Sequence, residues 1–375
     1  MLSPQKTYEL FLQHQLNFFT GVPDSLLKDF CAYVADHTPT KKNIITANEG
    51  NAIALAAGYH LATGKVGLVY LQNSGFGNCV NPLTSLTDPE VYSIPLLLLI
   101  GWRGEPGKKD EPQHKKMGKV MLETIKSLEI PYGILPETMV EAEKFVEEAV
   151  RYAALHSAPY AIIVREGTFE PYKLQNNKKT TFPLNREQAI RAVVPLLTSE
   201  DIIISTTGKT SRELFELRKE LQQGHDKDFL TVGSMGHASS IALGIALQKP
   251  DRAIYCFDGD GAVIMHMGSL ATIGKLAPKN FKHIIFNNFA HDSVGGQPTA
   301  ADVVDFRSVA QSCGYRASFL AETADQITEC MKKIKMMEGP VLLEIRCNKG
   351  ARENLGRPTR TPIENKQDFR EFLQK

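Results

Sequence analysis

The sequence has few cysteines, and no two of them have the spacing that binds zinc or supports thiol redox chemistry. Its six cysteines are scattered, and several lie in apolar stretches that predict strands or helices. We expect reduced, mostly buried thiols, as in a cytoplasmic protein.

Long apolar runs and an excess of charge of one sign are also missing. The most apolar run, Ile94 to Ile100, is far shorter than the roughly 20 residues of a membrane-spanning helix. The first ten residues carry polar and charged side chains where a signal peptide has an apolar core. Of the 375 residues, 43 are Lys or Arg and 42 are Asp or Glu. We therefore expect a cytoplasmic protein that binds neither membranes nor nucleic acids and is long enough for two domains.

What the chain has instead is a repeated alternation of short apolar runs with amphipathic stretches, which predicts α/β domains with parallel sheets covered on both faces. In the first half, strands are predicted at 18–22, 43–47, 66–71, 96–101 and 160–164, and helices at 24–36, 51–63 and 140–155. In the second half, strands are predicted at 202–205, 254–257, 283–286 and 341–346, and helices at 186–197, 211–221, 239–247, 262–276 and 302–313. A polar stretch interrupts this alternation, so we predict domains at 1–168 and 185–375 with a linker at 169–184.

Two polar corners in the second half follow neighbouring predicted strands. Gly259-Asp260-Gly261 follows the first strand, and Asn287-Asn288 follows the second. Carboxyl ends of parallel strands lie at one edge of a sheet, so a carboxylate and an amide oxygen can reach one cation there. Magnesium suits such a site, because it completes its coordination with phosphates and water. Each corner taken alone is equally compatible with a tight turn or a helix cap.

Together the two corners resemble the signature of thiamine diphosphate enzymes. The resemblance implies two similar three-layer domains, one for the aminopyrimidine of the cofactor and one for its diphosphate, here without the middle domain of many family decarboxylases. It makes Asp260 and Asn288 side-chain ligands of magnesium, and Ala290 a backbone-carbonyl ligand.

Glu49 is our choice for the carboxylate that contacts the aminopyrimidine. It lies between a predicted strand and a helix of small residues, where it could also serve only the helix dipole. The resemblance makes it the activating glutamate, which bonds a ring nitrogen and routes acid–base catalysis through the cofactor.

Two further segments fit the same cofactor. The segment Gly233 to Ala238 contains Met235, which is either a core methionine or, by resemblance, the side chain that bends the cofactor. The loop Thr206 to Thr210 lacks the first glycine of a Walker loop, which argues against a nucleotide-binding loop of that kind. We expect its backbone amides or hydroxyls to bind the diphosphate instead. The cofactor-binding residues expected are Glu49, Thr206, Gly208, Ser234, Met235, Gly259, Asp260, Gly261 and Asn288.

Three polar segments that packing does not explain suggest the substrate. They are Gly21 to Ser25, Trp102 to His114 and His291 to Thr299. Together with the chain length and the missing middle domain, these segments make the sequence resemble the phosphonopyruvate decarboxylases. Those enzymes convert 3-phosphonopyruvate to phosphonoacetaldehyde and carbon dioxide. Sulfopyruvate decarboxylases are close relatives that tend to have tyrosine where this chain has His291.

The resemblance leaves several roles open. The proton donor to the reaction intermediate is expected among His291, Asp292 and Asp24. The phosphonate needs cationic or polar partners. The cations considered are Arg103, Lys108, Lys109, His114, Arg352 and Arg357, each of which could instead be a surface charge. Asp24 is also expected at the substrate.

In this class the active site lies between subunits, so the resemblance implies at least a homodimer. The alternatives are a sulfopyruvate decarboxylase, another thiamine-dependent 2-oxoacid lyase or carboligase, and a non-catalytic phosphate-binding α/β protein. A structural subunit that binds the cofactor without catalysis is disfavoured by Glu49.

Overall fold

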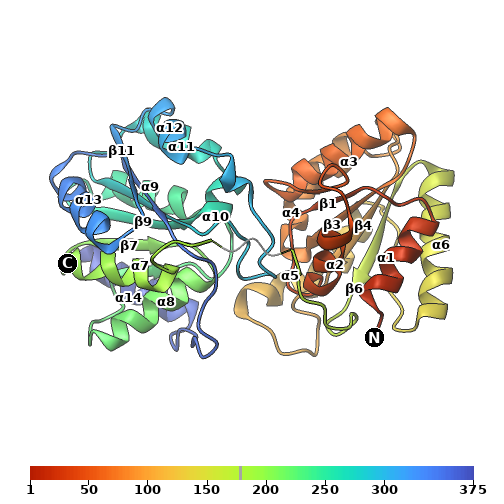
Figure 1. Ribbon diagram of the computed structural model, residues 1–375, viewed down its shortest axis with the longest axis horizontal. Coiled ribbons are helices and arrows are strands. Elements are labelled where there is room, and N and C mark those ends of the chain that lie inside the picture. The colour runs from red at the N-terminus through yellow and green to blue at the C-terminus, as the bar shows by residue number, and fades with distance from the viewer. Residues whose placement is uncertain (177–179) are drawn as a thin grey trace. The chain divides into compact units, whose positions relative to one another are not determined.

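The computed structural model describes residues 1–176 and 180–375, and the chain divides into two compact units (Figure 1). Unit 1 comprises residues 1–177 and 294–297, and unit 2 comprises residues 178–293 and 298–375. The predicted linker includes Asn177, Lys178 and Lys179, which lie outside the described residues.

Unit 1 contains a six-stranded sheet in the order β2-β1-β3-β4-β6-β5, and each neighbouring pair is parallel. Its strands are β1 (Phe19–Gly21), β2 (Asn43–Ile45), β3 (Gly67–Gln72), β4 (Leu96–Gly101), β5 (Tyr132–Ile134) and β6 (Pro159–Val164). Its helices are α1 (Pro4–Gln13), α2 (Lys28–His37), α3 (Glu49–Thr63), α4 (Phe76–Ser85), α5 (Pro112–Ser127) and α6 (Met139–His156).

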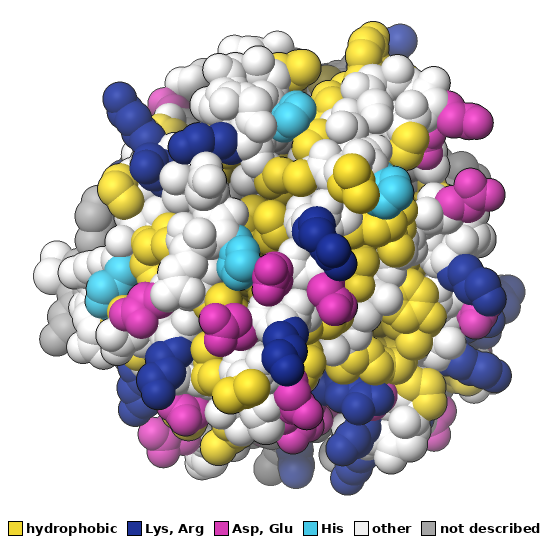
Figure 2. Space-filling view, turned by 90° about the vertical axis from the view of Figure 1, so that its right-hand side faces the viewer, with side chains coloured by type: hydrophobic (Ala, Val, Ile, Leu, Met, Phe, Trp, Pro, Cys, Tyr) yellow, Lys and Arg dark blue, Asp and Glu magenta, His cyan; other side chains and the backbone are white. Residues whose placement is uncertain are grey.

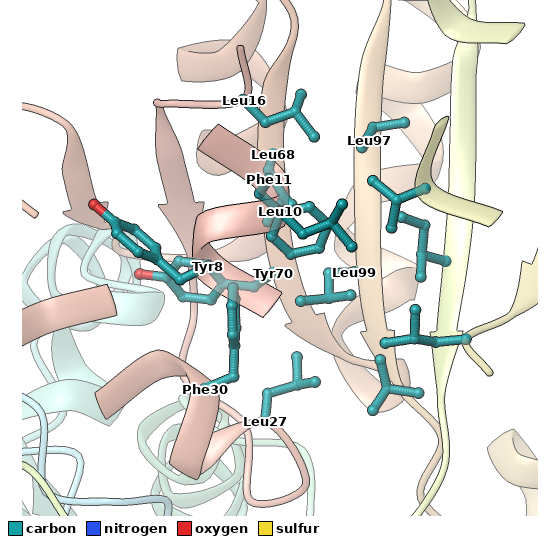
Figure 3. Close-up of a cluster of buried hydrophobic side chains, with 14 of the residues drawn as sticks. Tyr8, Leu10, Phe11, Leu16, Leu27, Phe30, Leu68, Tyr70, Leu97 and Leu99 are labelled. Carbon is teal, nitrogen blue, oxygen red and sulfur yellow. The ribbon is translucent and has the colours of Figure 1, made fainter. Parts of the chain in front are cut away.

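The apolar run of β4 is buried on both faces of this sheet. Leu97 and Leu99 belong to one hydrophobic cluster, whereas Leu96 and Leu98 belong to another. Successive strand residues point to opposite faces, so helices must cover both sides. Figure 3 shows the first cluster, in which side chains of α1 and α2 pack against those of β3 and β4. The three-layer arrangement predicted for this half is confirmed.

Unit 2 repeats the design, with a parallel sheet in the order β11-β12-β10-β9-β7-β8. Its strands are β7 (Ile202–Ser205), β8 (Asp228–Leu230), β9 (Ile254–Gly259), β10 (Phe281–Asn287), β11 (Ala317–Ala321) and β12 (Val341–Arg346). Its helices are α7 (Arg186–Val193), α8 (Lys209–Glu220), α9 (Ala238–Gln248), α10 (Asp260–Met265), α11 (Gly268–Leu276), α12 (Phe306–Ser312), α13 (Ala324–Met336) and α14 (Pro362–Gln374).

The structure corrects two predicted helices. The helix expected from residue 24 begins only at Lys28, because Asp24 turns its carboxylate to the backbone of Leu26 instead of entering a helix. The helix expected over 262–276 is divided into α10 and α11, because His266 leaves the helical conformation with φ −133° and ψ 47°. Strands β5, β8 and β11 were not predicted.

Charges of both signs are interspersed on the face of the surface shown in Figure 2, with hydrophobic side chains between them. That pattern agrees with the near balance of acidic and basic residues in the sequence. In the described ranges, 1–176 and 180–375, no helix combines the length and the apolar character needed to cross a membrane.

Candidate active site

Strands β9 and β10 bring the two polar corners of unit 2 together. Residues 254–259 pair in parallel register with residues 281–286, so the chain leaves both strands at the same edge. Asp260 is the first residue of α10 and Asn288 follows β10, and their exposed fractions are 2% and 3%. Backbone N–H groups of Asn288 and Gly261 donate to the Asp260 carboxylate, as does the Thr299 hydroxyl. The predicted juxtaposition of a carboxylate and an amide is therefore present.

Burial raises the pKa of Asp260 to about 6, although its hydrogen bonds act in the opposite direction. The neighbouring Ala290 forms an antiparallel bridge with Pro298, and its N–H donates to the Asn288 side-chain oxygen at 3.2 Å. A buried carboxylate beside an amide and a fixed loop is a suitable oxygen site for a hard cation.

A second group of possible metal ligands lies in the core of the same unit. Cys256, Asp258 and His283 place one ligand atom each within 4.8 Å of one another, and all three are buried. His283 Nε2 lies 3.5 Å from Asp258 Oδ2. Sulfur and imidazole are poor ligands for magnesium, which prefers oxygen. Magnesium is therefore better matched to the Asp260 corner.

His291 and Met235 meet at Gly261. A Cβ atom placed on Gly261 would lie 3.2 Å from His291 Cε1 and 3.3 Å from the Met235 methyl carbon. Burial lowers the pKa of His291 to about 4, so its imidazole is neutral at pH 7. Ser234, next to Met235, has a positive φ of 55°. The structure thus joins three segments that are far apart in the sequence around one point beside Asp260.

The Thr206 to Thr210 loop presents a buried hydroxyl without a partner among the described residues. The Thr206 hydroxyl oxygen is buried and has no hydrogen-bond partner among the described residues. Gly208 has a φ of 91°, where L side chains are strained, and precedes α8, which begins at Lys209. Gly259 has open space where a Cβ would point. A hydroxyl without a protein partner and the N-terminus of a helix that begins after a glycine are both suited to bind a diphosphate.

Asp292, expected as a possible proton donor, is already engaged. Its Oδ2 accepts from Arg186 Nη1 at 3.1 Å, and its Oδ1 accepts from the backbone N–H of Gly350 at 3.1 Å.

In unit 1, Glu49 lies at the start of α3 with 5% of its surface exposed. Asn78 Nδ2 of α4 donates to Glu49 Oε2 at 2.7 Å. The other oxygen, Oε1, lies 2.0 Å from where a Cβ on Gly75 would stand, so only glycine fits there. Burial raises the pKa of Glu49, and the Asn78 bond opposes that shift. Asn78 holds one oxygen of this buried carboxylate, and the other oxygen lies against the backbone of Gly75, which has no side chain. This arrangement fits the expected contact with a ring nitrogen.

Asp24 is fully buried at the end of β1. Gln72 Nε2 donates to its Oδ1 at 2.6 Å, and the Leu26 N–H donates to its Oδ2 at 3.0 Å. A Cβ on Gly101 would lie 2.0 Å from Oδ2. Burial raises the pKa of Asp24, and the Arg103 charge opposes that shift. The carboxyl ends of β1, β3 and β4 therefore meet around this acid.

The loop after β4 holds Arg103 beside Asp24. Asp110 pairs with Arg103 through Nε at 2.8 Å and through Nη2, while Nη1 donates to Ser25 Oγ at 2.7 Å. His114 Nδ1 is buried and has no partner among the described residues, and burial lowers the His114 pKa to about 4. Lys108 is exposed and lines the same small hollow as Arg103.

The cations near the carboxyl terminus are placed differently. Arg352 Nε donates to Glu187 at 2.9 Å, and its Nη2 pairs with Glu216. Both Arg352 and Arg357 lie between β12 and α14. The guanidinium of Arg352 is thus directed to α7 and α8.

Sequence reasoning missed the residues that hold the predicted ones in place. They are Thr299, which donates to Asp260, Asn78, which donates to Glu49, and Gln72 and Asp110 of the Asp24 region. Asn78 lies inside α4 and Gln72 ends β3, and neither belongs to a recognisable motif. The available signals were the segments Trp102 to His114 and His291 to Thr299, which contain Asp110 and Thr299.

Known proteins resemble both halves of this chain. Residues 7–124 match the model described as thiamine pyrophosphate enzyme, N-terminal TPP binding domain, and residues 207–345 match the corresponding C-terminal TPP binding domain. A phosphonopyruvate decarboxylase of Streptomyces viridochromogenes is 35% identical over 94% of this chain and 90% of its own length. The chain belongs to the phosphonopyruvate decarboxylase family of thiamine diphosphate enzymes.

Two further relatives extend over most of this chain. A phosphonopyruvate decarboxylase of Streptomyces hygroscopicus is 36% identical over 94% of this chain and 89% of its own length. A sulfopyruvate decarboxylase of Methanosarcina acetivorans is 28% identical over 89% of this chain and 88% of its own length. The cofactor of this family member is thiamine diphosphate, and the orphan hydroxyl of Thr206 and the glycine cradle at Glu49 fit it.

Proposed function

We propose that the chain catalyses the magnesium-dependent conversion of 3-phosphonopyruvate to phosphonoacetaldehyde and carbon dioxide, with thiamine diphosphate as cofactor. The observation that carries this proposal is the similarity to two phosphonopyruvate decarboxylases over 94% of the chain. The cofactor supplies a carbon nucleophile and then accepts the electrons that the departing carbon dioxide leaves behind.

The residues of the chain take separate parts in this proposal. Asp260, Asn288 and the Ala290 carbonyl hold the magnesium, and Thr206, Gly208 and Ser234 contact the diphosphate. Glu49 bonds a ring nitrogen of the aminopyrimidine with the oxygen that Asn78 leaves available.

Substrate binding is assigned to the groups around Asp24 and Arg103. A phosphonate close to a dianion at pH 7 needs fixed cationic donors, since binding it displaces water from both partners. Arg103 is held by Asp110 and Ser25, so its guanidinium is already oriented. His114 and Lys108 flank it. Arg352 has less support, because two carboxylates already pair with it.

Proton transfer to the intermediate is assigned to His291 or Asp24. His291 lies beside Gly261 and Met235, next to the metal corner. Burial raises the pKa of Asp24, so it carries a proton at higher pH than an exposed aspartate.

A homo-oligomer of at least two chains is part of the proposal. Ala54, Gly58 and Leu61 form an exposed stripe on α3. This helix contains no Asp, Lys or Arg, which is unusual for a helix with an exposed face. On α9, Ser240, Gly244 and Leu247 form a stripe with the same spacing. Both glycines have open space where a Cβ would point, which suits close contact with another backbone. A second copy of the chain is the partner that the family relationship favours.

We also propose a cytoplasmic location. Its support is that the six cysteines are free and that five of them are buried.

The test is a direct turnover assay. The purified protein is given 3-phosphonopyruvate with magnesium and thiamine diphosphate, and carbon dioxide and phosphonoacetaldehyde are both counted. We expect equal release of both, lost on omission of either cofactor and in Asp260→Ala.

Sulfopyruvate is assayed in parallel, because a sulfopyruvate decarboxylase is among the relatives. Faster turnover of sulfopyruvate would replace the proposed substrate. Carbon dioxide release without free aldehyde would instead indicate a carboligase.

A further inference from the structure

Asp292 lies in a network of charges that its position in the sequence does not suggest. Arg186, the first residue of α7, pairs with Asp292 on one side. On the other side it donates to both oxygens of Glu213 in α8, at 2.7 and 2.8 Å. The exposed fractions of Arg186 and Glu213 are 5% and 1%. An uncompensated charge at such a depth is costly, so the network requires each member.

Lys209 adds a second positive charge beside Asp292. Its Nζ lies 3.5 Å from Asp292 Oδ1 and donates to the Asp292 carbonyl at 3.0 Å. The backbone N–H of Gly350 reaches the same Oδ1. With Arg186 on Oδ2, each carboxylate oxygen therefore has a partner.

These contacts join the two loops that the proposed function assigns to the cofactor. The N–H of Asp292 donates to the Ala290 carbonyl at 2.9 Å, and Ala290 is an expected magnesium ligand. Lys209 directly follows Gly208 in the loop expected to receive the diphosphate. In addition, Ser293 Oγ lies 3.7 Å from where a Cβ on Gly208 would stand.

We propose that Asp292 is a positioning residue and does not donate a proton. Its carboxylate ties the metal-binding loop after β10 to the diphosphate loop before α8, and thereby sets the separation between the magnesium ligands and the diphosphate. The inference rests on the proposed function for the identity of the two loops.

The experiment measures cofactor affinity in the ligand-free protein by calorimetry. Thiamine diphosphate with magnesium, and inorganic pyrophosphate with magnesium, are titrated into the wild type, Asp292→Asn, Lys209→Met and the double variant. Outer-sphere partners of metal sites typically contribute 10–100-fold in affinity, so we expect each single variant to lose about tenfold. The double variant should lose less than the product of the single losses, because each change breaks the same link.

Two controls separate this effect from general damage. Asp251→Asn removes one negative charge from an exposed position of unit 2 and should leave affinity unchanged. Asp292→Glu keeps the charge and should restore part of the affinity. The melting temperature without ligand shows whether a variant is folded at the temperature of the titration.

Asp292→Asn with wild-type affinity for both ligands, but with lower kcat and an altered pH profile of kcat, would make Asp292 the proton donor and overturn the inference. Fully multiplicative losses in the double variant would also overturn it. Failure of the wild type to bind thiamine diphosphate would contradict the proposed function instead, which the same titration shows separately.

Discussion

At the scale of single residues, Asp260 combines two opposing requirements. A carboxylate must be ionised to bind a cation, whereas burial raises the pKa of Asp260 to about 6. Below that pH, protons compete with magnesium for the carboxylate. We predict that magnesium affinity falls about tenfold per pH unit below pH 6 and levels off above it. Calorimetric titration of magnesium in the presence of thiamine diphosphate, at pH 5 to 8, measures this dependence.

Thr299 offers a matched pair of controls for that pH dependence. Its hydroxyl donates to Asp260 and so favours the ionised form. Thr299→Val should raise the pKa of Asp260 and move the loss of affinity to higher pH, whereas Thr299→Ser should retain the wild-type profile. Identical profiles for the two variants would show that the hydroxyl does not influence the carboxylate.

Gly75 sets the position of the Glu49 carboxylate. A Cβ at this residue would lie 2.0 Å from Oε1, so Gly75→Ala must displace the carboxylate or the backbone. A misplacement of about 1 Å can cost on the order of 100-fold in rate, and we predict a loss of kcat of that size. Gly77→Ala is the matched control, since Gly77 has no atom within 4 Å of its Cβ position. Near-normal kcat in Gly75→Ala would show that the contact is not needed.

His291 is predicted to discriminate between the two possible substrates. It packs against Gly261 and Met235. Its imidazole is neutral at pH 7 and can donate one hydrogen bond. His291→Tyr places a larger ring at this point, as the related sulfopyruvate enzymes tend to do. We expect kcat/KM to fall about tenfold more for 3-phosphonopyruvate than for sulfopyruvate, a difference of about 1.4 kcal/mol. Equal losses would remove His291 as a determinant of specificity.

At the scale of elements, the sequence predicted strands well where they are buried on both faces. The bounds of β4, β7 and β12 agree with the predicted ranges, because largely apolar runs mark them. Strands β5, β8 and β11 escaped prediction, and each lies at an edge of its sheet. Their residues are partly exposed or polar, and their runs are only three to five residues long. An edge strand has one neighbour and one solvent-facing side, so it needs no such run.

The candidate site likewise contains residues that the sequence predicted and residues that it did not. Asp260 and Asn288 were found because parallel strands place their carboxyl ends at one edge, a rule that depends only on order along the chain. Asn78 acts through a hydrogen bond to the side chain of Glu49, and this partnership is set by how α3 and α4 pack. The role of Asp292 was open for the same reason, because its partner Arg186 lies 106 residues away in the sequence.

The loop after β10 contains a conformation that its residue type does not favour. Phe289 has a φ of 60°, in the left-handed region that costs most residues roughly 1–2 kcal/mol. Its ring stacks on Phe182 with centroids 5.8 Å apart, and the Arg346 guanidinium lies 6.0 Å from the ring centroid. Such contacts contribute about 0.5–1.5 kcal/mol each and offset the strain.

Comparing two substitutions at this position separates strain from packing. Phe289→Ala loses the contacts and keeps the strain, whereas Phe289→Gly loses the contacts and removes the strain. We predict that the melting temperature decreases in the order wild type, Phe289→Gly, Phe289→Ala. At an ordinary helix or strand position alanine is more stabilising than glycine by roughly 0.5–1 kcal/mol, so a reversed order would show that residue 289 is unstrained.

At the scale of the whole molecule, the two units of like design each carry a different set of the proposed functional residues. Unit 1 provides Glu49 and the Asp24 region, and unit 2 provides the metal corner and the diphosphate loop. The alternation of apolar runs and amphipathic stretches predicted two α/β domains, but the sequence did not reveal how many chains assemble. The stripes on α3 and α9 look like ordinary small residues until the structure shows that they are exposed.

The proposed assembly can be tested at the glycines of those stripes. Gly58 and Gly244 are exposed and have open space where a Cβ would point, so a long side chain is tolerated within the chain itself. If another backbone packs there, Gly58→Arg or Gly244→Arg must separate the subunits. We predict a mass near that of one chain, 41.6 kDa, by light scattering, with far-ultraviolet circular dichroism unchanged. Ala154→Arg, on the exposed face of α6, is the matched control and should keep the wild-type mass.

Thiamine diphosphate binding should disappear together with the oligomer, because a single chain then offers only half of each site. Full binding by a monomeric variant would instead place a complete site within one chain.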